Sequence, residues 1–512
     1  MSFSGPKIIL TDPDLFGRDS AEEDSEEAFQ AYVMDRPESG TFLDARNHIR
    51  IAKALKGEGK SALLRLVRTR LLQQSEPPVV VAVTGRDISP ILESTNSDLW
   101  TREWKKNILL SIAQHVGSQI GMAWTDDAIT LVEEAERSGS RPKNFISSVF
   151  DRLGEGTGIK RARPAIANAE KLMQRWLARA DSVWFFADDI DENFTNSPTD
   201  RIKVASFFMA ARDLSAKIPQ LRIRSAIRPT IWELLVQEFE ALAKVRQFLE
   251  DLRWTEEDMR DVLAARIRGY LRLTRQDESS GKYLPGHDRI LHPEALIALA
   301  FQLQVKWGNK DRPIYVPLTA FARRRPRWLF ELCRESARLA HQNHKDKITL
   351  GHITECMDTY GQNRISDTIA EFSSQCPQVG ELIQAFSQQK EEYATDELLT
   401  LITRRALQAM LPTINGKPAH GALEVAHFLY QIDFITAKRK ITDDRGKKII
   451  DDQGNEKYEH LAYANKPQLL KSRTNIDDGV RWEISPAFRQ ALLLRDSTGR
   501  ILRRPPKDLR GR

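Results

Sequence analysis

Short apolar runs that alternate with helical patterns constrain this chain more than any other feature. Residues 79–83 (VVVAV), 183–187 (VWFFA) and 221–227 (LRIRSAI) are strand-sized, and the first two are apolar throughout. Continuous runs of this kind are typical of strands that are buried on both faces of a sheet. Residues 49–53 form a fourth candidate strand. Because helical patterns separate these runs, they predict a parallel sheet with right-handed helical crossovers, that is, an α/β core.

The segment after the candidate strand at residues 49–53 has the pattern of a phosphate-binding loop. It reads A-L-K-G-E-G-K-S over residues 54–61, with Ala54 where the pattern G-x-x-x-x-G-K-[S/T] has its first glycine. Glycines let the backbone approach phosphates, Lys60 can bring a positive charge to them, and Ser61 can offer a hydroxyl to Mg²⁺. A solvated loop of the same composition is the alternative. The residues expected to contact nucleotide here are Gly57, Glu58, Gly59, Lys60, Ser61 and Ala62.

An acidic motif, DDIDE, directly follows the second long apolar run. Hydrolysis of a nucleoside triphosphate needs a carboxylate near the Mg²⁺ ion and a group that orients or deprotonates water. We assign the metal role to Asp188, together with Ser61, and the catalytic role to Asp189; Asp191 and Glu192 are lesser candidates. We expect the strand that ends at Asp188 to neighbour the strand before the phosphate-binding loop. An acidic loop that merely follows a core strand is the alternative interpretation.

The order of patterns divides the chain into several parts. From Trp232 to about Thr368 the signals are almost entirely helical, with breaks at 279–287 and 309–317. After residue 396 two helical patterns precede three short strand candidates around a charged turn. The expected fold class is an α/β P-loop NTPase core with a parallel sheet, followed by an all-α lid and a C-terminal winged-helix (α+β) domain. The expected parts are an acidic N-terminal lead-in at 1–45, the P-loop core at 46–235, the helical lid at 236–372, a linker at 373–395, the winged-helix domain at 396–495 and a basic tail at 496–512.

Charge is unevenly distributed over a chain whose net charge is only +6. Residues 1–40 hold ten acidic against three basic side chains, and residues 438–512 hold nineteen basic against eleven acidic. A basic C-terminal end can contact DNA; two solubilising tails of opposite sign are the alternative. No apolar run approaches the roughly 18 residues that cross a bilayer, and the start lacks the pattern of a signal peptide. We therefore expect a cytoplasmic protein without membrane contact.

Several separate motifs resemble those of one protein family. They are an N-terminal F-G-x-x-x-A-E-E-D (Phe16, Gly17 and 21–24), the loop KGEGKSALL, the acidic DDID, RSAIRPTIWELL, LRWTEEDMRDVLAARI (252–267), RRRPRWLFELC (323–333) and a C-terminal YQIDFI…WEISPAFRQAL. The chain looks like the bacterial P-loop ATPases that are related to the AAA+, origin-recognition and STAND NTPases. The resemblance spans about residues 14–495. The sequence departs from the family pattern at Ala54, and at Asp189, where many AAA+-type relatives have glutamate.

The resemblance also implies roles for four arginines. It would make Arg228 or Arg224, on the strand beside Asp188, a sensor-like group, and Arg325 or Arg327 a second sensor on the helical lid. An arginine near the γ-phosphate stabilises the transferred charge and responds to its loss. We place Arg228 and Arg327 among the catalytic residues and Arg325 among the nucleotide contacts. The three cations before the lid helix also suggest a nearby anion, because cations are disfavoured at a helix N-terminus.

Together these expectations describe a molecular switch that binds and hydrolyses ATP with Mg²⁺. The lid would close over the core and move the winged-helix region relative to DNA or a partner effector protein. The resemblance implies a homo-oligomer and a role in bacterial anti-phage defence or mobile-element biology. Two alternatives stay open: a DNA-binding regulator whose nucleotide-binding core no longer hydrolyses, and a protein-docking subunit of a multi-component effector complex. Lys60, Ser61 and Asp188 favour hydrolysis, whereas Ala54 favours a degenerate site.

Overall fold

The computed structural model describes residues 8–18, 23–118, 182–274, 292–307, 310–441, 449–450, 456–471, 480–496 and 499. It divides the chain into two compact units, each described here by itself. The core unit is Asp35–Arg253, and the second unit is Met1–Met34 with Trp254–Arg512. The expected basic tail lies outside the described residues apart from Asp496 and Gly499. Among the described helices, none has the length and apolarity needed to cross a membrane.

A five-stranded parallel sheet forms the centre of the core unit, in the order β2-β3-β4-β1-β5. Its strands are β1 (Ile49–Lys53), β2 (Val79–Thr84), β3 (Val183–Asp188), β4 (Leu221–Ile227) and β5 (Leu249–Asp251). The first four lie where the apolar runs predict them. The sequence patterns do not predict β5, because three residues are too few to show a period. Since β5 pairs with β1, the core unit runs to Arg253 and not to residue 235.

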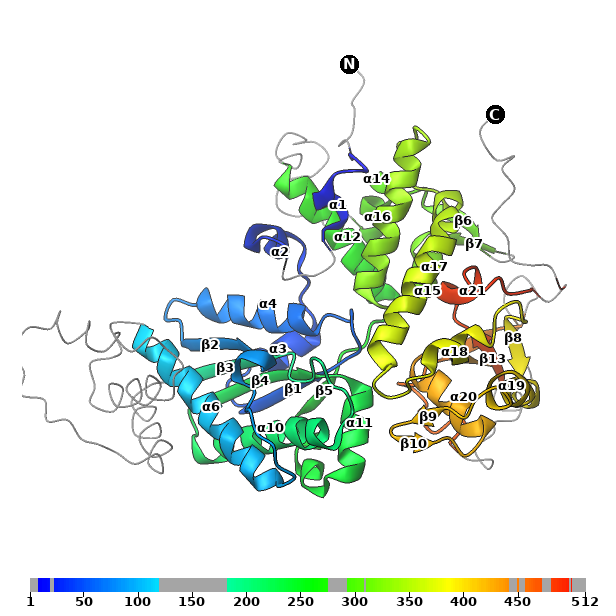
Figure 1. Ribbon diagram of the computed structural model, residues 1–512. Helices are drawn as coiled ribbons and strands as arrows, with labels where there is room; N and C mark the ends of the chain where they lie inside the picture. The colour runs from blue at the N-terminus through cyan, green and yellow to red at the C-terminus, as the bar shows by residue number, and fades with distance from the viewer. Residues whose placement is uncertain are drawn as a thin grey trace, which may run out of the picture. The chain divides into compact units, whose positions relative to one another are not determined.

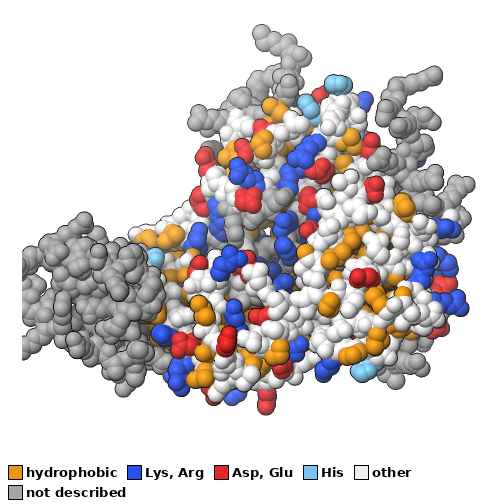
Figure 2. All heavy atoms as spheres, in the orientation of Figure 1, with side chains coloured by type: hydrophobic (Ala, Val, Ile, Leu, Met, Phe, Trp, Pro, Cys, Tyr) orange, Lys and Arg blue, Asp and Glu red, His pale blue; other side chains and the backbone are white. Residues whose placement is uncertain are grey.

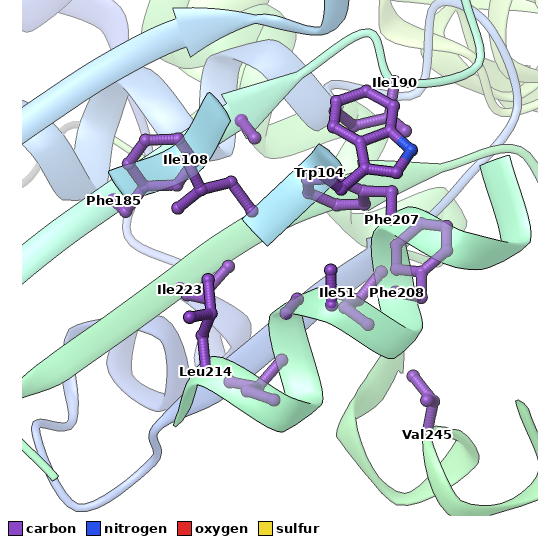
Figure 3. Close-up of a cluster of buried hydrophobic side chains, with 14 of the residues drawn as sticks. Ile51, Trp104, Ile108, Phe185, Ile190, Phe207, Phe208, Leu214, Ile223 and Val245 are labelled. Atoms are coloured by element: carbon purple, nitrogen blue, oxygen red, sulfur yellow. The ribbon is translucent and has the colours of Figure 1, made fainter. Parts of the chain in front are cut away.

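Helices cover both faces of the sheet (Figure 1). On one face lie α3 (Pro37–Leu43) and α4 (Lys60–Leu72), and on the other lie α6 (Ser97–Ser118), α10 (Pro198–Lys217) and α11 (Pro229–Glu238). Side chains of β3 alternate between the two cores, with Phe185 facing α6 and α10 and Phe186 facing α4. Figure 3 shows Phe185 in the larger core, with Trp104 and Ile108 of α6 and Phe207 of α10. Burial on both faces explains the continuous apolar runs.

The second unit contains a group of longer helices with recognisable start signals. They are α12 (Glu256–Leu273), α14 (Pro293–Ala300), α15 (Tyr315–Phe321), α16 (Pro326–Gln342) and α17 (Leu350–Phe372). A capping box of Thr255 and Asp258 starts α12, and Pro326 occupies the first position of α16, where its missing N–H costs nothing. The break expected at 309–317 contains a strand, and the strand that pairs with it lies before the expected break. The antiparallel hairpin of β6 (Gln304–Trp307) and β7 (Lys310–Pro313) interrupts the helices.

The C-terminal part of the second unit has the element order of a winged helix. It contains the helices α18 (Val379–Gln384), α19 (Thr395–Ile402) and α20 (Ala422–Gln431) and an antiparallel sheet in the order β12-β11-β13-β8, on which α19 and α20 pack. The strands are β8 (Glu392–Ala394), β11 (Ile435–Lys440), β12 (Tyr458–Leu461) and β13 (Arg481–Ile484). The fold class expected from the sequence is thereby confirmed. The expected linker at 373–395 instead contributes α18 and the edge strand β8, because the backbone of β8 pairs with β13.

The N-terminal segment packs on the helices of the second unit. It forms α1 (Pro13–Phe16) and α2 (Glu26–Tyr32), which contact α12. The Arg266 guanidinium of α12 donates two hydrogen bonds of 3.1 Å to the Asp24 carboxylate and lies 3.6 Å from the centroid of the Tyr32 ring. A Cβ atom at Gly17 would lie 1.4 Å from that guanidinium. The described residues of the F-G-x-x-x-A-E-E-D motif therefore take part in packing: Gly17 and Asp24 both lie against Arg266, and Phe16 is buried. The described part of the expected lead-in up to Met34 belongs to a folded unit.

Loss of the Arg266 guanidinium should destabilise the second unit strongly. Both members of the Arg266–Asp24 pair are almost completely buried, with side-chain exposures of 4% and 6%. Arg266→Ala leaves a buried carboxylate without its cation, so we expect the free energy of unfolding to fall by about 3–5 kcal/mol. Urea denaturation of the full chain measures the change.

The matched control for this prediction is Arg338→Ala. Arg338 pairs with Glu335 at 2.7 Å on an exposed surface, and such pairs contribute about 0–1 kcal/mol. Equal losses for the two variants would show that the Asp24 contact does not hold the N-terminal segment in place.

Candidate nucleotide-binding site

The phosphate-binding loop lies between β1 and α4, at the carboxyl edge of the sheet. Gly57 and Gly59 have φ angles of 84° and 93°, which lie in the left-handed region that glycine adopts without strain. Gly59 is the N-cap of α4, and Lys60 and Ser61 form its first turn. The free N–H groups of a helix N-terminus favour an anion. The backbone of this loop therefore has the geometry that the sequence motif predicts.

Two side chains of the loop bond to the loop itself. The Lys60 ammonium donates to the carbonyl oxygens of Ala54 at 2.9 Å and Leu55 at 3.2 Å. The Glu58 carboxylate accepts a hydrogen bond from the backbone N–H of Leu55. Glu58, which the sequence predicts to contact nucleotide, thus binds the backbone at the start of the loop, and Lys60 at the end of the loop does the same. Ser61 and Ala62 are half-buried in the first turn of α4.

Ala54 replaces the first glycine of the motif without backbone strain. Its φ angle is negative, unlike those of Gly57 and Gly59. Its methyl group is buried in the core beneath α4, and its N–H bonds the carbonyl oxygen of Ile227 at 3.3 Å. A side chain is therefore accommodated at this position. The departure from the family pattern does not distort the loop.

The acidic motif ends β3 at the same edge of the sheet. Asp188 is half-buried, and its Oδ1 accepts a hydrogen bond of 2.9 Å from the N–H of Asp189. Asp189 has a φ angle of 53°, a conformation that few residues other than glycine adopt. The expectation that β3 neighbours β1 is wrong, because β4 lies between them. A parallel sheet brings all three carboxyl ends to one edge, so the acidic motif and the loop still share that edge.

Gly85, directly after β2, makes room for the acidic motif. A Cβ atom there would lie 2.5 Å from the carbonyl oxygen of Asp189 and 2.7 Å from Cα of Ile190. Only a glycine allows this approach. The sequence reasoning missed this residue, although a glycine that follows an apolar strand is a recognisable signal.

Of the two arginines considered on β4, Arg228 lies at the carboxyl edge and Arg224 lies inside the core. Arg224 donates to the carbonyl oxygens of Phe42 at 2.6 Å, Ile223 at 3.0 Å and Asp44 at 3.2 Å. Burial lowers the pKa of its guanidinium to about 9. Arg224 thus ties the end of α3 to the sheet, and Arg228 is the sensor candidate that remains.

Arg228 is held by Asp191, a residue that the sequence ranks as a lesser catalytic candidate. The buried Asp191 carboxylate accepts hydrogen bonds from Arg228 Nε at 2.8 Å and from its backbone N–H at 3.0 Å. Arg228 Nη2 also donates to the carbonyl oxygen of Asp191. Glu192 instead pairs with Arg86 at 3.2 Å in an exposed position. The pairing of Asp191 with Arg228 has no signal in the sequence, because 37 residues separate the two.

The predicted second-sensor arginines belong to the second unit, before and within the first turn of α16. Arg325 is buried and pairs with Glu371 of α17 at 3.0 Å, and Arg323 pairs with Asp433 at 3.1 Å. Protein carboxylates therefore pair with two of the three arginines at 323–325. From the sequence, these three cations suggested a nearby anion and contact with a ligand. Arg324 is exposed and Arg327 is half-buried. The Nε atom of Arg327 is buried and has no hydrogen-bond partner among the described residues.

The fold and this edge of the sheet define the class of the protein: an α/β P-loop NTPase core followed by helical and winged-helix parts. Three solved structures are similar. Cdc6p from Pyrobaculum aerophilum has 12% sequence identity and a TM-score of 0.30, and the match covers 83% of this chain and 91% of that chain. The ORC2 protein of Aeropyrum pernix in ADPNP-ADP complexes has 11% identity and a TM-score of 0.39, with 94% of this chain and 96% of that chain covered. Drosophila ORC bound to DNA has 12% identity and a TM-score of 0.29, with 92% of each chain covered. No protein-family profile and no curated protein matches the sequence. The roles proposed below rest on the residues of this chain.

Proposed function

We propose that the core unit binds ATP with Mg²⁺ at the phosphate-binding loop and hydrolyses it. The observation that carries this proposal is the shared position of Lys60, Ser61 and Asp188 at the carboxyl edge of one parallel sheet. In open α/β sheets, ligands bind at that edge. Release of phosphate from ATP by the purified protein, alone and with duplex DNA, tests the proposal directly.

Each residue at this edge has a role that its chemistry suits. Lys60 leaves the carbonyl oxygens of the loop to meet the β- and γ-phosphates, and Ser61 and Asp188 are the oxygen ligands suited to Mg²⁺. When bound, Mg²⁺ neutralises charge that develops on the phosphates. Asp189 orients or deprotonates the attacking water, and Arg228 stabilises the transferred charge. The roles of Arg327 in catalysis and of Arg325 in nucleotide contact stay predictions from the family resemblance.

We further propose that the second unit transmits the nucleotide state as one body. Arg323 donates a hydrogen bond of 3.0 Å to the carbonyl oxygen of Ile432 and pairs with Asp433. It therefore joins the turn before α16 to the winged-helix part. A Cβ atom at Gly361 of α17 would lie 2.8 Å from Cβ of Ala491, which shows how closely the two parts pack. A movement of the lid helices would therefore carry the winged helix with it.

Helix α20 lacks the Lys and Arg side chains that most often bind the bases and phosphates of DNA. In helix-turn-helix proteins the second helix of the pair enters the major groove, and here that helix is α20. It contains neither Lys nor Arg, and none of its residues is exposed. Tyr463 packs on its His427 and Tyr430, with ring centroids 5.6 and 5.5 Å apart. We therefore propose that contact with DNA goes to the phosphate backbone and not to bases through α20.

Cations suited to phosphate contact occur elsewhere in the C-terminal part. Figure 2 shows Lys and Arg side chains gathered near β8. Lys390 precedes β8, Arg404 and Arg405 follow α19, and all three are exposed. The basic tail adds further positive charge in the sequence. A partner effector protein, a homo-oligomer and a role in anti-phage defence stay predictions from the family resemblance. A cytoplasmic location stays a prediction from the apolar runs and the N-terminal sequence.

Removal of residues 497–512 should weaken the salt dependence of DNA binding. Each phosphate that a protein neutralises contributes about −0.9 to the slope of log affinity against log salt concentration. The segment contains six basic side chains and one acidic one. We expect the slope to flatten by several units, measured by fluorescence anisotropy of labelled duplex DNA at several salt concentrations. An unchanged slope with intact binding would favour the protein-docking alternative.

A further inference from the structure

We propose that Asp191 is a positioning residue that connects Arg228 to the acidic motif at Asp188 and Asp189. This inference rests on the proposed ATPase function and deepens it. Asp191 itself would not contact the nucleotide or the metal, because its carboxylate is buried and engaged by Arg228. It would instead make the sensor arginine and the catalytic carboxylates move together.

The contacts between the two residues fix Arg228 at three points. One carboxylate oxygen of Asp191 binds both the Nε atom and the backbone N–H of Arg228, and the Asp191 carbonyl oxygen accepts from Nη2. The backbone contact also places Asp191 at the start of α11, since Arg228 is the N-cap of that helix. Among the described residues, Nη1 of Arg228 has no hydrogen-bond partner, so one corner of the guanidinium stays available for a phosphate oxygen.

The acidic motif is rigid on its other side as well. Ile190 and Phe194 are buried in the core beneath α6 and α10. Gly85 presses against the backbone of Asp189 and Ile190, and the N–H of Glu192 donates 3.0 Å to the carbonyl oxygen of Asp189. Packing and backbone hydrogen bonds therefore hold the residues on both sides of Asp191. A displacement of Arg228 toward a γ-phosphate must pull on Asp191 and, through it, on Asp189.

A double-mutant cycle in the full-length protein tests the proposal. The variants are Asp191→Asn, Arg228→Gln and the two combined, with Glu192→Gln as the matched control in the same loop. The measurements are kcat, KM for ATP, and the Mg²⁺ concentration at half-maximal rate. We expect each single variant to lower kcat about 10–100-fold, the range of one general positioning or electrostatic contact, with KM and the Mg²⁺ requirement changed less than threefold.

The combined variant decides the question. If Asp191 acts through Arg228, adding Asp191→Asn to Arg228→Gln should change kcat less than twofold, because residues that act as a unit are not additive. Losses that multiply, or a raised Mg²⁺ requirement for Asp191→Asn, would overturn the proposal. Should Asp191→Asn fail to fold, Arg228→Lys replaces it: this change keeps the cation but loses the Nε contact, and a wild-type kcat would equally overturn the proposal.

Failure of this inference differs from failure of the proposed function. A wild-type protein that shows no turnover of ATP refutes the proposed hydrolysis and the inference that rests on it. A wild-type protein that hydrolyses ATP while Asp191 and Arg228 act independently refutes the inference alone.

Discussion

Lys60→Ala should abolish the thermal stabilisation of the protein by MgATP while leaving its fold unchanged. The Lys60 ammonium bonds only the carbonyl oxygens of Ala54 and Leu55, so its loss costs little in the free protein. With ligand, the loss removes the charge that faces the β- and γ-phosphates. For the wild-type protein at a ligand concentration 100 times Kd, the free energy of unfolding should rise by about 2.7 kcal/mol. Differential scanning fluorimetry with and without MgATP measures the difference.

The matched control is Lys56→Ala, a change of the same kind in the same loop. Lys56 is exposed and lies before the two glycines, so its loss should leave the stabilisation by MgATP nearly intact. If Lys60→Ala were stabilised by MgATP as strongly as wild type, nucleotide would bind somewhere other than this loop. A lowered melting temperature of Lys60→Ala without ligand would instead mean that the lysine supports the loop structure.

Asp188→Asn should reduce ATP turnover by about 10²–10³-fold, which corresponds to about 3–4 kcal/mol of the activation barrier. Asparagine has nearly the same shape, and its Oδ1 can still accept the hydrogen bond from the N–H of Asp189. The change therefore removes a charge and little else. Because a neutral amide is a poorer ligand for Mg²⁺, the Mg²⁺ concentration at half-maximal rate should rise. Phosphate release measured over a Mg²⁺ titration gives both quantities.

Glu192→Gln is the control for the Asp188 prediction. Glu192 carries the same charge and lies four residues away, but its side chain pairs with Arg86 and is 42% exposed. We expect less than a threefold change in rate and no change in the Mg²⁺ requirement. Equal losses for Asp188→Asn and Glu192→Gln would show that the net charge of the acidic motif matters and the strand-end position of Asp188 does not.

The sequence predicts the sheet well because both of its faces are covered. Continuous apolar runs appear wherever a strand contacts helices on two sides, as in β2 and β3. The same signal fails for β5 and β8, which have three residues each and pair at an edge. It also fails for the N-terminal segment, where many carboxylates surround the buried side chains of Leu10, Leu15, Phe16 and Phe29.

The candidate site divides along similar lines. Motif residues of the loop and of the strand end, such as Lys60 and Asp188, can be recognised in the sequence because their chemistry needs fixed spacing along the chain. The partners of the arginines are not visible in this way. Asp191 with Arg228, and Glu371 with Arg325, are pairs 37 and 46 residues apart, and only the packed structure brings their charges together.

The sequence alone determined the α/β class, the phosphate-binding loop and the acidic strand end. Each of them depends on the spacing of nearby residues or on the pattern of buried residues within one helix or strand. Tertiary structure decided the rest. It placed β4 between β1 and β3, joined the N-terminal segment to α12 through Asp24 and Arg266, and gave protein carboxylates to the basic turn before α16. All of these features depend on contacts between distant segments, which no local pattern specifies. In the charge pairs, a buried charge needs a partner of opposite sign, and the partner can lie anywhere along the chain.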